Sequence, residues 1–159
     1  AESIAEPSRA EVLIGGRCRD DIITVTEFER LGVKTFVSTE DGSLGDMGLV
    51  TKVLEQRLEQ KPLAKVFACG PMPMIRAVEK ICRSKGVQLQ VSMEELMACG
   101  VGACLGCVVK GEGHTTEKPS YLCTCTVGPV FNASDLDWDA PHSGSDIAGG
   151  SGCECGAKQ

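Results

Sequence analysis

The stretch KVFACGPMPMIRAVEKICRSKGVQLQV, residues 65–91, predicts a strand, a helix and a second strand in succession. Residues 65–69 form a short apolar run typical of a strand, and residues 87–91 alternate apolar and polar side chains. Between them, residues 73–86 place apolar side chains along one helical stripe and end at a glycine, with basic residues in the last turn. The stripe consists of Met74, Ile75, Val78, Ile81 and Cys82.

Similar signals precede this unit. Residues 11–15 and 34–38 have the apolar and β-branched composition of strands. Residues 20–32 and 48–61 have helical periodicity, and Asp20 is the expected cap of the first of these helices. Strands that alternate with helices predict right-handed crossovers and a mostly parallel, doubly wound sheet of the α/β class.

Charge and hydropathy exclude two kinds of partner. The chain has 16 lysine and arginine residues against 22 aspartate and glutamate residues, a net charge of −6. No basic cluster offsets this charge, so we expect no nucleic-acid binding. No apolar run is long enough to span a bilayer, and residues 1–10 lack the pattern of a secretory signal. These features favour a cytoplasmic protein.

Ten cysteines are the unusual feature of the composition. Three of them, Cys99, Cys104 and Cys107, are spaced C-x4-C-x2-C within MEELMACGVGACLGCVVK, residues 93–110. With a distant fourth cysteine, this is the spacing of plant-type [2Fe–2S] sites. The glycines and alanines between the cysteines let the chain curl around an inorganic core and aim its N–H groups at sulfur.

The identity of the fourth ligand stays open on spacing alone. The segment CTC offers Cys123 and Cys125. A zinc site is an alternative, although zinc knuckles more often use C-x2-C pairs. Disulfides are a third possibility, against which the tight spacing and the lack of an export signal count.

The alternation of strands and helices stops after residue 91. Residues 11–91 are therefore the expected α/β nucleotide-binding-like domain. Residues 92–131 hold few large apolar side chains, so we expect a small subdomain whose metal centre supplies the missing stability. Residues 132–159 are rich in glycine, serine and aspartate and predict a flexible tail.

Two loops that follow predicted strands are candidate nucleotide contacts. ACGPMPM, residues 68–74, lies at the carboxyl end of a strand, where open α/β sheets bind their ligands. Its glycine lets the backbone approach a flat ring, and its prolines stiffen the turn. TEDGSLG, residues 39–45, offers a carboxylate and a hydroxyl to a ribose or a phosphate, or is an ordinary turn. Arg17 and Arg19 follow the first strand and either meet a phosphate or are solvated charges.

Residues 65–110, followed by a cysteine just before GPVF (128–131), resemble the electron-transfer subunit of type B dihydroorotate dehydrogenase, a member of the ferredoxin–NADP reductase superfamily. The most specific motifs are CGPMPM and EELMACGVGACLGC, and the resemblance extends over roughly residues 11–131. In that family the subunit carries FAD and a [2Fe–2S] cluster. It passes electrons between an FMN-containing catalytic subunit and NAD during dihydroorotate oxidation in pyrimidine synthesis.

Carried over residue by residue, the resemblance implies that Cys99, Cys104 and Cys107 are the first three cluster ligands. It makes Cys125 the fourth, because the family places a cysteine at that position before GPVF. It also implies that the CGPM loop lies by the nicotinamide and flavin rings, and that residues 41–43 lie near the nucleotide. The candidate cofactor contacts are thus Asp41, Gly42, Ser43, Cys69, Gly70, Pro71 and Met72.

The sequence departs from the family at its start. Family members begin with an FAD-binding β-barrel, and their nucleotide domain opens with a strand and a glycine-rich turn. Residues 11–21 resemble the second strand, so we expect these earlier segments to be missing here. Val127 replaces the acidic residue usual before GPVF.

The expected function is that of an electron-transfer component rather than a complete enzyme. Its [2Fe–2S] cluster would relay electrons between a flavin or NAD(P) site and a flavin-containing catalytic partner, with FAD and NAD(P) as the further cofactors implied by the resemblance. The alternative is a structural zinc-containing docking module of a larger enzyme complex, without redox activity of its own.

Overall fold

The computed structural model describes residues 6–139. The chain divides into two compact units, one extending to Pro62 and the other beginning at Leu63, and each is described by itself. A domain boundary between residues 91 and 92 stays a prediction. Among the described residues, no helix is long and apolar enough to cross a membrane.

The first unit contains a three-stranded parallel sheet in the order β1-β2-β3. Its strands are β1 (Glu11–Gly16), β2 (Lys34–Thr39) and β3 (Asp46–Met47). Its helices are η1 (Pro7–Arg9), η2 (Arg19–Asp21), α1 (Val25–Arg30) and α2 (Val50–Gln60). α2 packs against β1 and β2 and buries Val53 and Leu54.

The helix expected over residues 20–32 is wrong in its first half. η2 ends at Asp21, and α1 begins only at Val25. Thr24 has a left-handed backbone conformation, with φ of +66°, which interrupts any helix that runs through it. Consecutive β-branched side chains in this stretch also disfavour a helix, and Ile23 is left 69% exposed. Asp20 lies in η2 and does not cap α1.

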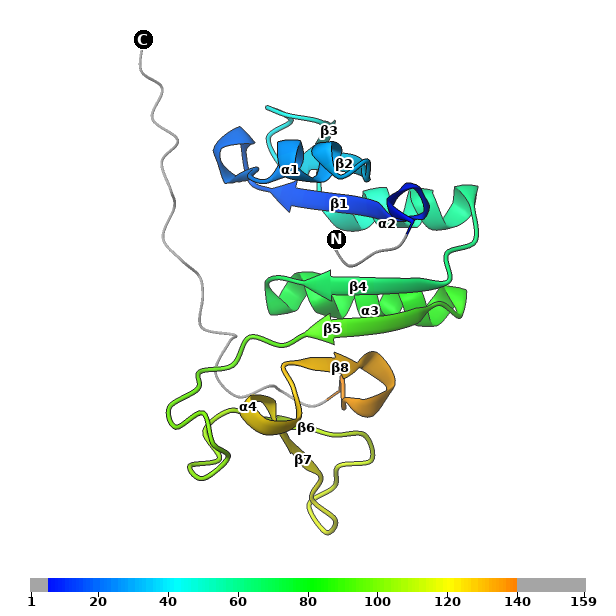
Figure 1. Cartoon of the computed structure of the whole chain (residues 1–159). Coiled ribbons are helices and arrows are strands. Elements are labelled where there is room, and N and C mark those ends of the chain that lie inside the picture. Colours follow the sequence, from blue (N-terminus) through cyan, green and yellow to red (C-terminus); the bar gives the residue numbers. More distant parts are fainter. Residues whose placement is uncertain (1–5, 140–159) are drawn as a thin grey trace. The chain divides into compact units, whose positions relative to one another are not determined.

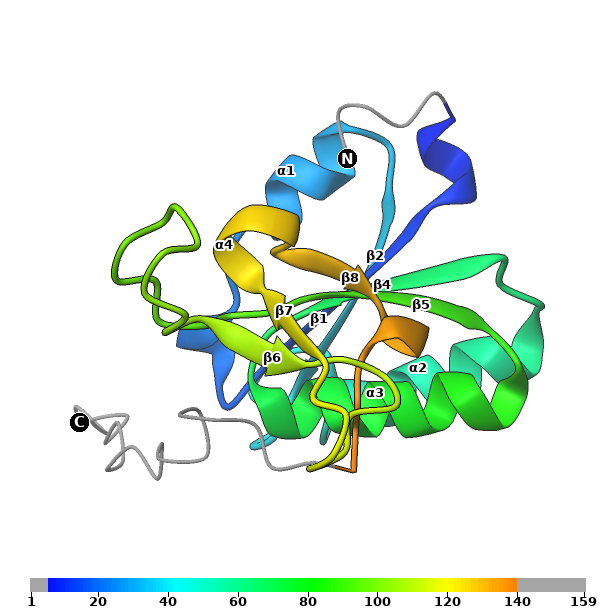
Figure 2. The ribbon, with the colours of Figure 1, turned by 90° about the horizontal axis from the view of Figure 1, so that it is seen from below.

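The second unit begins with the predicted strand–helix–strand unit. β4 (Lys65–Cys69) and β5 (Gln88–Ser92) pair in parallel, from Lys65 opposite Gln88 to Cys69 opposite Ser92. α3 (Met72–Lys85) connects them and packs against both strands (Figures 1 and 2). Its buried apolar side chains are Met72, Ile75, Val78 and Cys82. The α/β class and the parallel pairing are therefore confirmed.

The region after β5 holds more regular structure than the sequence predicts. β6 (Val108–Lys110) and β7 (Tyr121–Cys123) form an antiparallel hairpin. The single-turn helix α4 (Thr124–Val127) leads to β8 (Val130–Asn132), which pairs antiparallel to β5 and places Phe131 opposite Val91. Strands of three residues are too short to show a periodicity.

The expected tail also begins with ordered structure. Residues 132–139 complete β8, form the turn η3 (Ala133–Asp135) and anchor Trp138, whose indole N–H donates to the Ala133 carbonyl at 2.7 Å. Residues 140–159, with Cys153 and Cys155, lie outside the described part of the chain.

Candidate metal centre

A loop rich in small residues carries the first three predicted ligands. It follows β5 and lies beside α4 (Figures 1 and 2). Gly100 and Gly102 have φ values of +68° and +77°, so the chain curls where other residues would be strained. As a result, the backbone N–H of Cys104 donates to Cys99 Sγ, and that of Gly106 donates to Cys104 Sγ, each at 3.4 Å. The backbone thus directs N–H groups at sulfur, as the composition predicts.

The third cysteine is joined to the segment that carries the fourth. Cys107 is 2% exposed, and its Sγ accepts a hydrogen bond from the backbone N–H of Cys125 at 3.4 Å. The Cys107 carbonyl accepts another from the N–H of Thr124 at 3.0 Å. The start of α4 is thereby fixed against Cys107. Cys123 lies just before the helix, and its carbonyl accepts the hydroxyl of Thr126 at 3.3 Å.

Electrostatics link the two pairs of cysteines. The N–H of Val101, with the N–H and thiol of Cys104, lowers the pKa of Cys99 to about 6, so this thiol is largely a thiolate at neutral pH. The pKa of Cys125 is raised, first by its hydrogen bond with the Cys107 side chain and then by burial, and the nearby Cys99 side chain adds to the shift. Cys125 therefore senses both Cys107 and Cys99, and a bound cation would offset this shift.

The cysteine pairs can be compared with the needs of a binuclear cluster. In residues 6–139, no three cysteine, histidine, aspartate or glutamate side chains form a site for a single ion. A [2Fe–2S] cluster needs two ligands on each of two irons, and the pairs Cys99–Cys104 and Cys107–Cys125 offer that set. The residues present fit a binuclear cluster.

A thiol and a carboxylate meet at the carboxyl ends of β4 and β5. Cys69 is exposed, and its Sγ donates to Oε1 of Glu94 at 3.7 Å. The next residue, Gly70, has φ of +144°, and a Cβ there would lie 2.8 Å from Cε of Met74. Cys69 is the exposed residue of this edge, whereas the side chain of Met72 is 6% exposed and belongs to the core.

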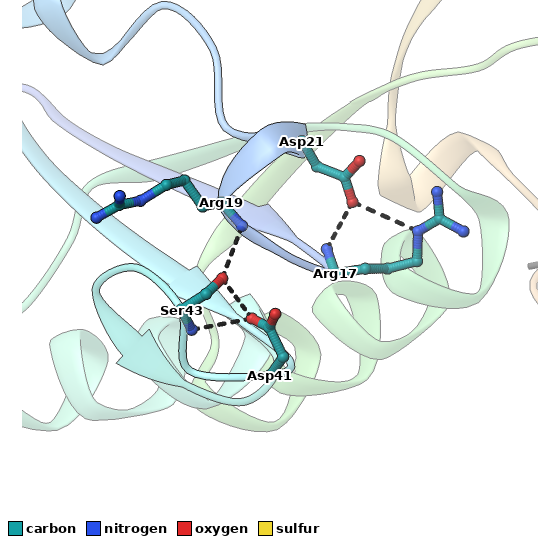
Figure 3. Close-up of polar contacts among 5 residues, drawn as sticks. All are labelled: Arg17, Arg19, Asp21, Asp41 and Ser43. Atoms are coloured by element: carbon teal, nitrogen blue, oxygen red, sulfur yellow. Dashed lines mark hydrogen bonds and ion pairs between the residues drawn. The ribbon is translucent and has the colours of Figure 1, made fainter. Parts of the chain in front are cut away.

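The loops after β1 and β2 are bonded to each other in the first unit (Figure 3). The Ser43 hydroxyl accepts the backbone N–H of Arg19 at 2.8 Å and donates to Oδ1 of Asp41 at 2.6 Å. These contacts with Ser43 lower the pKa of Asp41. The Asp21 carboxylate accepts the backbone N–H of Arg17 at 2.9 Å and its side-chain Nε at 3.4 Å.

The structure joins the predicted site residues in small sets. Backbone-to-sulfur hydrogen bonds link Cys104 to Cys99 and Cys125 to Cys107. Cys69 and Gly70 lie together at the end of β4, and residues 41–43 share one turn. Sequence reasoning did not single out Glu94 or Asp21. Glu94 is detectable only through strand register, because Cys69 and Ser92 end neighbouring parallel strands.

Residues 94–137 match the family model of the iron–sulfur cluster binding domain of dihydroorotate dehydrogenase B. Curated relatives named as the electron transfer subunit of dihydroorotate dehydrogenase B (NAD(+)) match a longer stretch. The protein from Caldanaerobacter subterraneus subsp. tengcongensis is 44% identical over 112 residues, which are 70% of this chain and 43% of the relative. The chain is a relative of these electron-transfer subunits.

Further comparisons agree with this relationship. The Fusobacterium nucleatum electron-transfer subunit is 37% identical over 128 residues, covering 79% of this chain and 46% of that protein. A solved structure of an NADH-dependent reduced ferredoxin–NADP oxidoreductase, described for flavin-based electron bifurcation, superposes with a TM-score of 0.66 at 26% identity. The superposition covers 81% of this chain and 44% of the solved chain. The chain thus spans less than half the length of the electron-transfer subunits it matches.

Proposed function

We propose that this chain relays electrons through a [2Fe–2S] cluster between a flavin or NAD(P) site and a partner oxidoreductase. The observation that carries the proposal is the arrangement of four cysteines in two hydrogen-bonded pairs inside the segment that matches the cluster-binding family. The family match names an iron–sulfur cluster, and the C-x4-C-x2-C spacing is that of plant-type [2Fe–2S] sites.

The proposed ligands are Cys99, Cys104, Cys107 and Cys125. The choice of Cys125 over Cys123 is supported by its N–H bond to Cys107 Sγ and by its electrostatic contact with Cys99. When bound, the cluster supplies a one-electron carrier. The chain's own residues hold the thiolates, direct N–H groups at sulfur and bury the Cys107 side of the site, and these features set a reduction potential.

The nucleotide role rests on the carboxyl ends of the parallel strands. Ligands of open α/β sheets bind there. Cys69 with Gly70, and the 41–43 turn, each lie at such an end. We propose these as contacts for a nicotinamide nucleotide and a flavin, with Pro71 shaping the turn. A doubly wound arrangement of residues 11–91, with the cluster subdomain in 92–131, completes the proposed architecture.

The partner is proposed from the relatives. Their names associate them with dihydroorotate dehydrogenase B and NAD, so we propose a flavin-containing catalytic subunit of that type as the electron donor, in pyrimidine synthesis. We propose a role as one component rather than as the whole enzyme. The cytoplasmic location stays a prediction.

Anaerobic purification followed by metal analysis, a visible spectrum and EPR after dithionite reduction tests the proposal. We expect about two irons per chain and a rhombic EPR signal only in the reduced state. Flavin absorbance in the same spectrum would report FAD. Zinc without iron in a colourless protein would overturn the electron relay and favour the structural docking module.

A further inference from the structure

Thr124 has a buried hydroxyl group without a partner. The residue is 0% exposed, and its Oγ1 makes no hydrogen bond within the part of the chain that the structure describes. A buried hydroxyl left unpaired costs about 1–3 kcal/mol, so proteins rarely retain one without a reason. A valine would fill the same space without that cost.

The position of Thr124 relates this hydroxyl to the candidate cluster. Thr124 directly precedes Cys125 and opens α4. Its backbone N–H donates to the Cys107 carbonyl at 3.0 Å, and the next N–H, of Cys125, donates to Cys107 Sγ. The N–H groups of two successive residues therefore hold Thr124 against the buried Cys107. The backbone N–H of Thr124 is already bonded, whereas its hydroxyl has no partner among the described residues.

The candidate acceptor for this hydroxyl lies with the neighbouring ligand, since Thr124 directly precedes Cys125. A threonine hydroxyl has one rotatable O–H donor, and in a closed site its partner must lie within reach. We propose that the Thr124 hydroxyl donates a hydrogen bond to a sulfur of the cluster, either a bridging sulfide or a ligand thiolate, and thereby raises the cluster's reduction potential. The inference rests on the proposed function, because the acceptor is the cluster itself.

The direction of the effect follows from charge. Reduction adds one negative charge to the cluster, and a hydrogen bond to sulfur stabilises the more negative state. Removal of the donor should therefore make reduction less favourable. A loss of up to about tenfold in the equilibrium constant for reduction corresponds to 59 mV for a one-electron couple.

The test compares variants of the full chain with its cluster bound. Thr124→Val keeps the shape and removes the hydroxyl, Thr124→Ala removes the hydroxyl and part of the side chain, and Thr124→Ser keeps the hydroxyl. Thr126→Val is the matched control, because its hydroxyl is exposed and donates to the Cys123 carbonyl. The midpoint potential is measured by redox titration followed by EPR, and iron is counted in each variant.

We expect lower potentials in Thr124→Val and Thr124→Ala, with two irons retained, and wild-type potentials in Thr124→Ser and Thr126→Val. If one of the first two variants fails to load iron, the other still decides. An unchanged potential in the variants that lack the hydroxyl would overturn the inference, as would an equal shift in Thr126→Val. Two irons per chain in the wild type would still support the electron relay even if the Thr124 inference is wrong. Zinc in place of iron in the wild type would contradict both the relay and the Thr124 inference.

Discussion

Cys107 and Cys125 are joined by a hydrogen bond from the backbone N–H of Cys125 to Sγ of Cys107, across 18 residues of sequence. The hairpin β6–β7 lies between them, so its pairing brings the end of the cysteine-rich loop to the start of α4. Backbone structure therefore holds the Cys125 segment beside Cys107.

This relationship predicts the outcome of two neighbouring substitutions. Cys125→Ser should lose most of the bound iron, because it removes a thiolate from the pair with Cys107. Cys123→Ser should keep about two irons per chain. Iron analysis and the visible spectrum of both variants measure the difference. If Cys123→Ser loses the iron and Cys125→Ser retains it, the ligand set is wrong.

Glu94 should control the reactivity of Cys69. Its carboxylate lies 3.7 Å from Cys69 Sγ and repels anionic reagents. Glu94→Gln should raise the rate of Cys69 alkylation by iodoacetate, relative to that by neutral iodoacetamide, about threefold at low salt. Peptide mapping by mass spectrometry follows Cys69 alone. The exposed Glu117→Gln is the control, and an equal change in both variants would show that only net charge matters.

Glu11 should stabilise the first unit above acidic pH. Arg57 donates to both carboxylate oxygens, at 3.0 and 2.8 Å, and Lys61 lies 2.8 Å from Oε1. The Glu11 side chain is 9% exposed, and the hydrogen bonds from Arg57 lower its pKa from 4.5 to about 2. The folded state therefore binds the proton more weakly, and its stabilisation is complete above pH 4.5 and is lost as the pH falls towards 2.

Glu11→Gln should accordingly reduce the free energy of unfolding by about 2–3 kcal/mol at pH 7 and by less at pH 3. Urea unfolding of the wild type and the variant at pH 7 and pH 3 measures the loss of unfolding free energy at each pH. Glu6→Gln is the control, because its ion pair with Arg9 is exposed and should contribute less than about 0.5 kcal/mol. A deficit for Glu11→Gln that is the same at both pH values would contradict the assigned role of its charge.

Gly45 should tolerate no side chain. It has φ of +68°, and a Cβ would lie 2.1 Å from the Val37 carbonyl oxygen, which is a backbone atom and cannot move aside. Gly45→Ala should cost more than about 3 kcal/mol. Gly32→Ala isolates the conformational part, about 1–2 kcal/mol, since Gly32 has φ of +73° and nothing within 4 Å. Thermal unfolding compares the stabilities of the two variants. Equal losses of stability would contradict the steric explanation for Gly45.

Long periodic elements were predictable from the sequence, and short ones were not. β4, α3 and β5 appear within one residue of their predicted bounds, because a helix of 14 residues between two apolar strands has a strong pattern. The predicted helix over residues 20–32 was wrong in its first half, because the left-handed conformation of Thr24 has no sequence signal of its own. The three-residue strands β6, β7 and β8 gain their stability from pairing, which no local pattern records.

The same division applies to the site. The spacing is enough to propose three of the four ligands, because a [2Fe–2S] core dictates how its cysteines are spaced. The choice between Cys123 and Cys125 needed the resemblance, and the contact with Cys107 now supports it. Glu94 and Thr124 were not recognisable, because their interest lies in strand register and in an unpaired buried atom respectively.

The anchoring of Trp138 has a practical consequence. It is the one tryptophan of the chain, and its indole is bonded within the second unit. Excitation at long ultraviolet wavelengths therefore yields an emission that reports on that unit alone, and circular dichroism reports on both units together. Denaturation followed by the two signals will separate the melting of the half that holds the cysteines from that of the half that holds the 41–43 turn.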